Sequence, residues 1–257
     1  MKLTNNQNKS LSANQLKEIL CNNLSFAATE QYKLLRTNLN FTLPQQDKCY
    51  VIGMTSPMRA EGKSTTAVNL SYVMAESGKR VALIDCDLRI PSIAKKMNVD
   101  GDVGITDLLL GKQIEIDAFK SELLDNWYII PSGEIPPNPS ELLGSARMEN
   151  LLDNLKEQFD YIIVDLPPVN LVSDALSISR FISGLIVVIC QDATSKKEAD
   201  SCFQQIEFSG AKILGCVINE SRDAGEKHSR RNYYNRYNRS RRYGYGMDYS
   251  TSKETNS

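Results

Sequence analysis

The chain has 257 residues, with 30 Lys and Arg against 31 Asp and Glu, and 41% of its residues are hydrophobic. These values allow one domain of ordinary size or two small ones, and they exclude a chain that is disordered throughout. The single histidine, His228, excludes a multi-histidine metal site. A Ser-His-Asp mechanism would depend on that one residue, so we set it aside.

Membrane insertion and secretion find no support in the sequence. The longest uninterrupted apolar run, 185–190, is far shorter than the roughly twenty residues that span a bilayer. Residues 1–12 are polar and lack the apolar stretch of a secretion signal. We therefore expect a cytoplasmic protein. The six cysteines form no Cys-x-x-Cys pair, and several lie in apolar runs, so free buried thiols are expected.

The first 44 residues are expected to form an N-terminal helical segment. Residues 11–43 predict one or two helices, and the apolar periodicity is clearest over 26–39. Glu30, Lys33 and Arg36 follow one another at i, i+3 spacing and form one charged stripe. As a solvated helix face, such a stripe contributes about 0.2–0.5 kcal/mol per ion pair.

Residues 45–221 are expected to form the main domain, because short β-branched apolar runs alternate there with helical patterns. Runs that are apolar throughout are typical of parallel strands covered on both faces. The alternation predicts an α/β fold with a doubly wound, mostly parallel sheet. Strands are expected at 49–54, 80–85, 127–130, 161–165, 184–190 and 213–219, and helices at 63–77, 105–110, 139–159, 173–182 and 195–209.

The C-terminal segment, 222–257, differs in composition from the rest. It holds nine Lys and Arg against four Asp and Glu, a net charge of +5, which leaves −6 for residues 1–221. Its only aliphatic residues are Ala224 and Met247, so we expect a flexible tail. Arginine with tyrosine is also typical of a nucleic-acid-binding arm. The tail contains six of the eleven tyrosines: Tyr233, Tyr234, Tyr237, Tyr243, Tyr245 and Tyr249.

A phosphate-binding loop is predicted between the first strand and the first helix of the main domain. Such a loop needs small residues whose backbone N–H groups face the phosphates, a lysine for the terminal phosphates and a hydroxyl for Mg²⁺. Gly62, Lys63 and Ser64 supply these elements, although Pro57 stands where the strict motif has glycine. The following helix would present its N-terminus to the anion.

Three carboxylates follow the apolar runs of two other predicted strands. Asp85 ends the run at 80–85, Asp87 and Arg89 follow it closely, and Asp165 ends the run at 161–165. Open parallel sheets bind ligands at this edge. A single carboxylate there is commonly only a solvated strand end, but three of them beside Gly-Lys-Ser indicate a nucleotide-bound Mg²⁺.

The combined motifs resemble the bacterial tyrosine kinases of capsule and exopolysaccharide synthesis, which are P-loop proteins of the deviant Walker class. The resemblance extends from about residue 25 to the end of the chain. It is carried by Gly-Lys-Ser-Thr at 62–65, Leu-Ile-Asp-Cys-Asp-Leu-Arg-Ile-Pro at 83–91, Ser-Gly-Glu-Ile-Pro-Pro-Asn-Pro-Ser-Glu-Leu-Leu at 132–143, Ile-Ile-Val-Asp-Leu-Pro-Pro at 162–168, Ser-Asp-Ala at 173–175 and the terminal tyrosine cluster.

This resemblance implies an ATP-dependent, Mg²⁺-dependent kinase that phosphorylates the tyrosines of its own tail. Residues 60–65, which are Ala60, Glu61, Gly62, Lys63, Ser64 and Thr65, would bind the nucleotide. Lys63 would contact the β- and γ-phosphates, and Ser64 and Asp165 would hold Mg²⁺, Asp165 directly or through water. Asp85 and Asp87 would share the roles of base and second metal partner; we favour Asp85 as the base and Asp87 near the metal.

Partners are implied by the same resemblance. They are a membrane-spanning activator of the chain-length-regulator type, further copies of the chain in a ring, and a cognate tyrosine phosphatase. The activator would recruit the chain to the inner face of the cell membrane. The stripe of Glu30, Lys33 and Arg36 would be the contact between subunits. No nucleic acid is expected as a partner.

Two departures from the family pattern matter. The family usually has glycine where this chain has Ala60, and alanine restricts positive φ, so the loop is expected to differ in shape or to bind nucleotide more weakly. The subunit-contact motif has Lys33 where the family has arginine, which gives up the planar bidentate fork.

Two other functions remain open from the sequence. A partition or division-site ATPase of the deviant Walker class would be a switch without kinase activity, but its signature lysine is replaced here by Met58. A nucleic-acid-binding protein would rest on the tail alone, and its affinity would fall steeply with salt.

Overall fold

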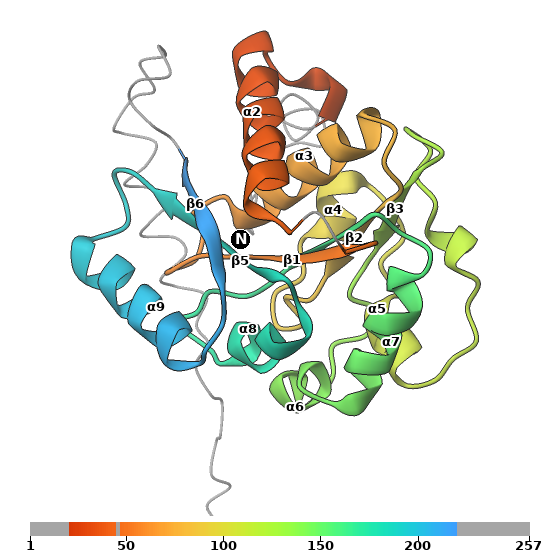
Figure 1. The fold of residues 1–257 in the computed structure, drawn as a ribbon. Helices are drawn as coiled ribbons and strands as arrows, with labels where there is room; N and C mark the ends of the chain where they lie inside the picture. The colour runs from red at the N-terminus through yellow and green to blue at the C-terminus, as the bar shows by residue number, and fades with distance from the viewer. Residues whose placement is uncertain (1–20, 45–46, 220–257) are drawn as a thin grey trace, which may run out of the picture. The chain divides into compact units, whose positions relative to one another are not determined.

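Six parallel strands form one sheet in the order β3-β2-β4-β1-β5-β6, in a computed structural model that describes residues 21–44 and 47–219 (Figure 1). The expected doubly wound α/β fold is confirmed, and the tail at 222–257 lies outside the described residues. The strands are β1 (Tyr50–Thr55), β2 (Val81–Asp85), β3 (Trp127–Ile130), β4 (Tyr161–Asp165), β5 (Gly184–Cys190) and β6 (Ile213–Asn219).

Helices cover both faces of the sheet, because alternate strand residues point to two separate apolar cores. In Figure 1, α2 and α3 lie on one side and α6, α8 and α9 on the other. The helices are α2 (Phe26–Thr42), α3 (Lys63–Glu76), α4 (Ile93–Met97), α5 (Ile105–Leu109), α6 (Pro139–Leu143), α7 (Ala146–Lys156), α8 (Asp174–Ser177) and α9 (Lys196–Phe208), with short 3₁₀ turns η1 (Cys21–Asn23), η2 (Ile116–Phe119) and η3 (Ser179–Phe181).

Some expected elements differ from the structure. The helix expected at 139–159 is two helices, because Ser145 is extended and its side chain accepts a hydrogen bond from the Met148 N–H, which starts α7. The helix expected at 173–182 is the short α8 followed by η3. Helix α4 and turn η2 were not expected, since each is too short for a periodic pattern. Cys216 is exposed, whereas the other five cysteines are buried as expected.

The N-terminal helix α2 packs against α3. Leu39 is its fully buried residue, and the Arg36 guanidinium donates a hydrogen bond of 2.6 Å to the carbonyl oxygen of Val73 in α3. Lys33 and Glu30 form an exposed ion pair at 3.0 Å on the same helix. The expected charged stripe is therefore present, but Arg36 is partly engaged within its own chain. Residues 11–20 of the expected helical segment lie outside the described residues.

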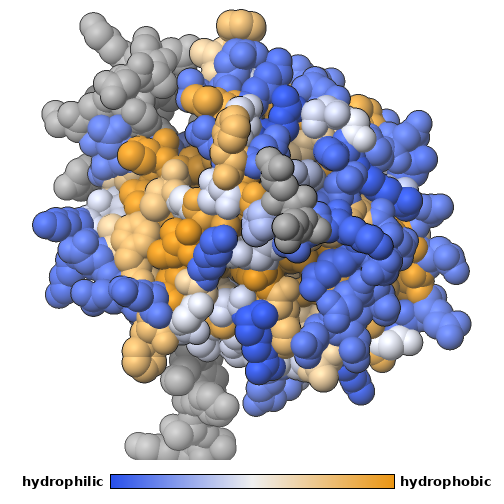
Figure 2. All heavy atoms as spheres, viewed as in Figure 1, coloured by the Kyte–Doolittle hydropathy of each residue, from blue (hydrophilic) through white to orange (hydrophobic). Residues whose placement is uncertain are grey.

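The surface is uneven in character. No helix of the described residues is long and apolar enough to cross a membrane. Figure 2 shows apolar surface gathered over β6, beside the largely hydrophilic helix α9. Strand β6 is an edge strand, and its side chains at Ile213 and Ile218 are exposed.

The fold predicts a measurable role for Ser71. The indole of Trp127 is fully buried, and its N–H donates a hydrogen bond of 3.1 Å to the Ser71 hydroxyl. Ser71→Ala would leave this donor unpaired, which costs about 1–3 kcal/mol of unfolding free energy. Urea unfolding followed by the emission of this single tryptophan measures the change. Exposed Ser77→Ala, at the end of the same helix, should stay within about 0.5 kcal/mol of wild type. Equal stability of the two variants would contradict the prediction.

Candidate active site

The strand register brings the predicted site residues to one edge of the sheet. Asp85 at the end of β2 pairs in register with Asp165 at the end of β4. Asp165 pairs in turn with Met54, just before the end of β1. The phosphate-binding loop leaves β1 at this edge and enters α3 at Lys63. Residues more than one hundred positions apart therefore meet because three neighbouring strands end together.

The side chain of Lys63 lies at the centre of this group. Its ammonium nitrogen is 2.8 Å from an Asp87 oxygen and 3.4 Å from an Asp165 oxygen. The Ser64 hydroxyl is 3.3 Å from the same nitrogen and also hydrogen-bonds to Asp165. The residues predicted to bind phosphate and metal thus form one cluster, which we call the Lys63 cluster: Lys63, Ser64, Asp87 and Asp165.

Asp85 lies beside the Lys63 cluster but is held by backbone groups. One of its oxygens accepts the N–H of Asp87 at 3.2 Å, and the other accepts those of Ser92 and Ile93 at 2.9 Å each. Asp87 in turn accepts the N–H of Ile90 at 3.1 Å. The two carboxylates therefore organise the whole loop from 85 to 93.

The charges in this site do not balance. Burial alone lowers the pKa of Lys63, but the neighbouring charges of Asp165 and Asp87 outweigh burial and raise that pKa above its usual value. Burial and the nearby Asp165 raise the pKa of Asp85 to about 7. Burial also raises the pKa of Asp165, against the opposing effect of Lys63. Three buried carboxylates facing one ammonium leave excess negative charge, which a divalent cation would offset.

The donor set fits Mg²⁺ bound together with a nucleotide. The candidates are oxygen atoms of a hydroxyl and of carboxylates, the ligands that Mg²⁺ prefers. Among residues 21–44 and 47–219, no three His, Cys, Asp or Glu side chains are grouped as a preformed metal site. Mg²⁺ would therefore take its remaining ligands from water and phosphate oxygens, as is usual for this ion.

The loop before Lys63 has two residues with positive φ. Ala60 has φ of 62° and Gly62 has φ of 91°. Ala60 adopts the left-handed conformation that glycine, the family's usual residue at this position, reaches without strain. That conformation costs an L-residue about 1–2 kcal/mol. The expected effect of alanine on the shape of the loop and on nucleotide affinity stays a prediction. A Cβ on Gly62 would lie 2.0 Å from the Asn219 amide nitrogen, so glycine is needed there for close approach as well.

Glu61 links this loop to two other strand ends. Its carboxylate, only 2% exposed, accepts hydrogen bonds from the Met58 N–H at 3.1 Å and from the Thr194 hydroxyl. Its carbonyl accepts a hydrogen bond of 3.0 Å from the Asn219 side chain. The Glu61 side chain therefore faces the protein, and only its backbone is placed to meet phosphate. Burial raises the pKa of this carboxylate to about 7, although both hydrogen bonds oppose the shift.

Thr194 and Asn219 are site residues that the sequence analysis missed. Asn219 ends the predicted strand at 213–219, so the rule that ligands bind at strand ends could have identified it. Thr194 lies in an irregular segment after β5 and carries no such signal. Thr65, predicted to bind nucleotide, lies half-buried in the first turn of α3. The six tail tyrosines lie outside the described residues.

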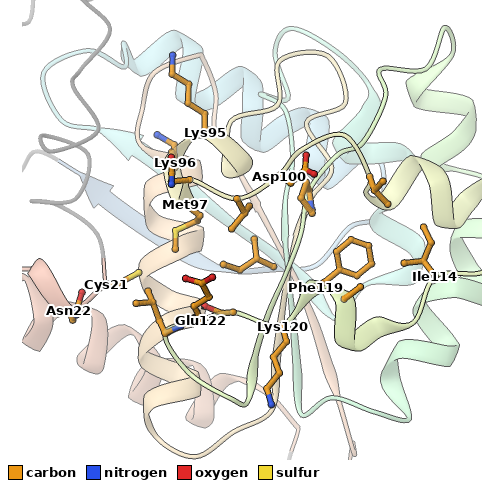
Figure 3. A pocket seen from close by; sticks show the side chains of 18 of the residues that line it. Cys21, Asn22, Lys95, Lys96, Met97, Asp100, Ile114, Phe119, Lys120 and Glu122 are labelled. Atoms are coloured by element: carbon orange, nitrogen blue, oxygen red, sulfur yellow. Dashed lines mark hydrogen bonds between the residues drawn. The ribbon is translucent and has the colours of Figure 1, made fainter.

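A cavity of about 900 Å³ lies apart from these residues, between α4, η1, η2 and the end of β3 (Figure 3). Its wall includes Cys21, Met97, Phe119 and Lys120, and none of the predicted site residues lines it. The volume of a cavity therefore does not identify the candidate active site in this fold. The Lys63 cluster is marked instead by charge and strand register.

Comparison with known proteins places the chain among kinases. A family model described as an AAA domain matches residues 51–207. The tyrosine-protein kinase YwqD of Bacillus subtilis is 35% identical over 207 residues, which cover 80% of this chain and 86% of YwqD.

Solved structures give the same picture. The kinase domain of the Escherichia coli tyrosine kinase ETK superposes with a TM-score of 0.72 at 28% identity, covering 83% of each chain. The chimerical protein CapA2B2 has a TM-score of 0.70 at 34% identity, covering 75% of this chain and 84% of the other. The cell division ATPase MinD of Pyrococcus furiosus is more distant, with a TM-score of 0.56 at 24% identity, and shares the fold.

The strain at Ala60 can be tested through stability. Ala60→Gly removes the cost of a left-handed alanine and should raise the free energy of unfolding by about 1 kcal/mol. The matched control is Gly78→Ala, where φ is 88° and a new Cβ meets nothing within 4 Å. This control should lower stability by a similar amount. Urea unfolding of both variants measures the changes, and a stability loss in Ala60→Gly would show that residue 60 does not have positive φ.

Glu61 should make stability depend on pH. Its folded-state pKa of about 7 lies above the ordinary 4.5, so its stabilising contribution is complete below pH 4.5 and is lost as pH rises through 7. Glu61→Gln cannot ionise and keeps much of the shape. Relative to wild type, we expect this variant to gain about 1–3 kcal/mol between pH 5 and pH 8. Thermal or urea unfolding across this range measures the difference, and a constant difference would contradict the raised pKa.

Proposed function

This chain belongs to the bacterial tyrosine kinases, and we propose that it transfers the γ-phosphate of ATP to tyrosines of its own tail. The observation that carries the proposal is the Lys63 cluster, which joins a buried lysine at the start of α3 to two buried carboxylates at one sheet edge. The sequence adds six tyrosines in a basic segment of the same chain. The enzyme would thus be covalently joined to its substrate.

In the proposed reaction, the phenolic oxygen of a tyrosine attacks the γ-phosphorus of ATP. The bond between that phosphorus and the β,γ-bridging oxygen breaks, ADP leaves, and a carboxylate takes the phenolic proton. Phosphoryl transfer needs positioning and charge stabilisation more than covalent catalysis. Lys63 would leave its carboxylate partners to contact the β- and γ-phosphates, while backbone N–H groups of residues 60–65 would surround them.

Mg²⁺ would supply charge neutralisation between the β- and γ-phosphates. We propose that Ser64 and Asp165 hold it, with Asp87 as a further partner. The contact of Ser64 with Asp165, and the 2.8 Å approach of Asp87 to the Lys63 ammonium, support this set. The same positions that now meet the lysine cation would then meet the metal ion.

Asp85 is the proposed acceptor of the tyrosine proton. Its pKa, raised to about 7 by burial and by Asp165, suits a base that works near neutral pH. Asp85 is also fully buried and accepts three backbone N–H groups. Proton transfer to Asp85 would therefore require one of these N–H groups to release its carboxylate oxygen when the tyrosine enters.

We further propose that phosphorylation passes between subunits of a ring that forms through α2. Glu30 and Lys33 are available on its exposed face, whereas Arg36 would share its guanidinium between the Val73 carbonyl and a neighbouring subunit. A membrane-spanning activator would recruit the chain to the inner face of the membrane, and a cognate phosphatase would reverse the reaction. One of the similar structures is the chimera named CapA2B2.

Regulation of capsule or exopolysaccharide synthesis is the proposed outcome. Each phosphate adds about −1.5 to −2 charges at neutral pH, so three or four would cancel the tail's net charge of +5. Phosphorylation would then weaken attraction between the tail and acidic surfaces of neighbouring subunits. The charge of the tail, which changes as phosphate is transferred from ATP, would control the assembly of the subunits.

Labelling tests the proposed function. The protein is incubated with labelled ATP and Mg²⁺, alone and with the cytoplasmic end of a candidate activator, and modified residues are mapped. We expect phosphotyrosine within 233–249 and none in Lys63→Met, because the terminal phosphates lose their cation. Thermal unfolding checks that this variant is folded.

A mixing experiment tests transfer between subunits. Lys63→Met with an intact tail is combined with active chain that lacks 222–257, and labelled tail is the expected product. No phosphotyrosine in wild type under either condition would refute the kinase function. Labelling of wild type without labelling in the mixture would refute transfer between subunits only.

A further inference from the structure

Three sequence motifs that the proposed chemistry leaves without a role meet at one group of side chains around the buried carboxylate of Asp174. Arg89 follows the two catalytic carboxylates, Ser140 lies at the start of α6, and Ser173 and Asp174 begin α8. The Arg89 guanidinium donates two hydrogen bonds to the Asp174 carboxylate, of 2.9 and 3.0 Å. We call Arg89, Ser140 and Asp174 the Arg89 clamp.

Ser140 completes the clamp. Its hydroxyl donates a hydrogen bond to Asp174 and lies 3.3 Å from the Arg89 guanidinium. The Ser173 hydroxyl lies 3.4 Å away from that of Ser140. Asp174 is 0% exposed, so its charge is compensated by these partners and not by water. A buried carboxylate with a planar, bidentate partner fixes geometry as well as charge.

The clamp acts on the loop that carries the catalytic carboxylates. Next to Arg89, the Ile90 N–H donates to Asp87, and further along the loop the N–H groups of Ser92 and Ile93 donate to Asp85. Holding Arg89 to α6 and α8 therefore fixes the backbone that sets the direction of Asp87. Asp87 in turn faces Lys63 at 2.8 Å.

We propose that Arg89, Asp174 and Ser140 are positioning residues for the metal-binding carboxylate Asp87. The clamp does not touch the reacting atoms. It orients the 85–93 loop by holding Arg89 to α6 and α8. This inference rests on the proposed Mg²⁺ and nucleotide site, and it assigns one role to three segments that are far apart in sequence. Partners that orient metal-binding carboxylates typically change metal affinity by about 10–100-fold when removed.

The test is the Mg²⁺ dependence of nucleotide binding, measured with a fluorescent ATP analogue. Asp174→Asn keeps the size of the side chain but removes the negative charge that pairs with Arg89. We expect the Mg²⁺ concentration for half-maximal binding to rise at least about tenfold, while affinity for the analogue without Mg²⁺ changes less than about twofold. A loss of fold alone would lower both affinities together.

The matched control is Asp107→Asn. The Asp107 side chain is 4% exposed, its ion pair with Lys112 is 2.6 Å long, and it lies outside the 85–93 loop. This variant should lose stability yet keep the wild-type Mg²⁺ dependence. If Asp174→Asn does not fold, Ser140→Ala removes a single hydrogen bond of the clamp and should shift the Mg²⁺ dependence in the same direction.

A double variant separates positioning from simple destabilisation. Because Arg89 and Asp174 act as one unit, Arg89→Ala combined with Asp174→Asn should shift the Mg²⁺ dependence no further than either change alone. Wild-type Mg²⁺ dependence in folded Asp174→Asn, or in Ser140→Ala where Asp174→Asn is unfolded, would overturn the proposal. Absence of tail phosphorylation in wild type would refute the kinase function while leaving this binding test in force.

Discussion

The burial of one ammonium group among carboxylates from different strands is the constraint on which this structure depends. Lys63 is almost without solvent, so its charge is tolerated only because Asp87 and Asp165 lie within 3.4 Å of it. Those partners come from the ends of β2 and β4, while Lys63 follows β1. The parallel order β2-β4-β1 brings Lys63 and the two carboxylates together, and the apolar cores on both faces of the sheet stabilise that order.

Much of this could be predicted from the sequence, because the signals are local. Apolar β-branched runs marked all six strands, and a carboxylate directly after such a run had to lie at the binding edge of a parallel sheet. The position of Gly62, Lys63 and Ser64 between a strand and a helix marked the phosphate loop. The family resemblance then implied roles that no spacing could supply, such as a base and a second metal partner shared between Asp85 and Asp87.

What could not be predicted depends on contacts between distant segments. Nothing near Thr194 in the sequence indicates that its hydroxyl meets Glu61, since that contact depends on how the segment after β5 turns. The positive φ of Ala60 could not be predicted for a related reason. Backbone preference disfavours a left-handed alanine, yet the surrounding hydrogen bonds of Glu61 hold the loop in that shape. Tertiary contacts override local preference where several of them act on one turn.

The excess negative charge of the site suggests why nucleotide and metal should enter together. ATP alone would bring further negative charge against Asp85, Asp87 and Asp165, with Lys63 as the cation at the centre of the cluster. A divalent cation alone would have to compete with Lys63 for the same carboxylate oxygens. With both present, Lys63 would turn to the phosphates, and Asp87 and Asp165 would hold the metal ion in its place. Such an exchange would keep every buried charge compensated, and it would couple the binding of the two ligands through the side chain of Lys63.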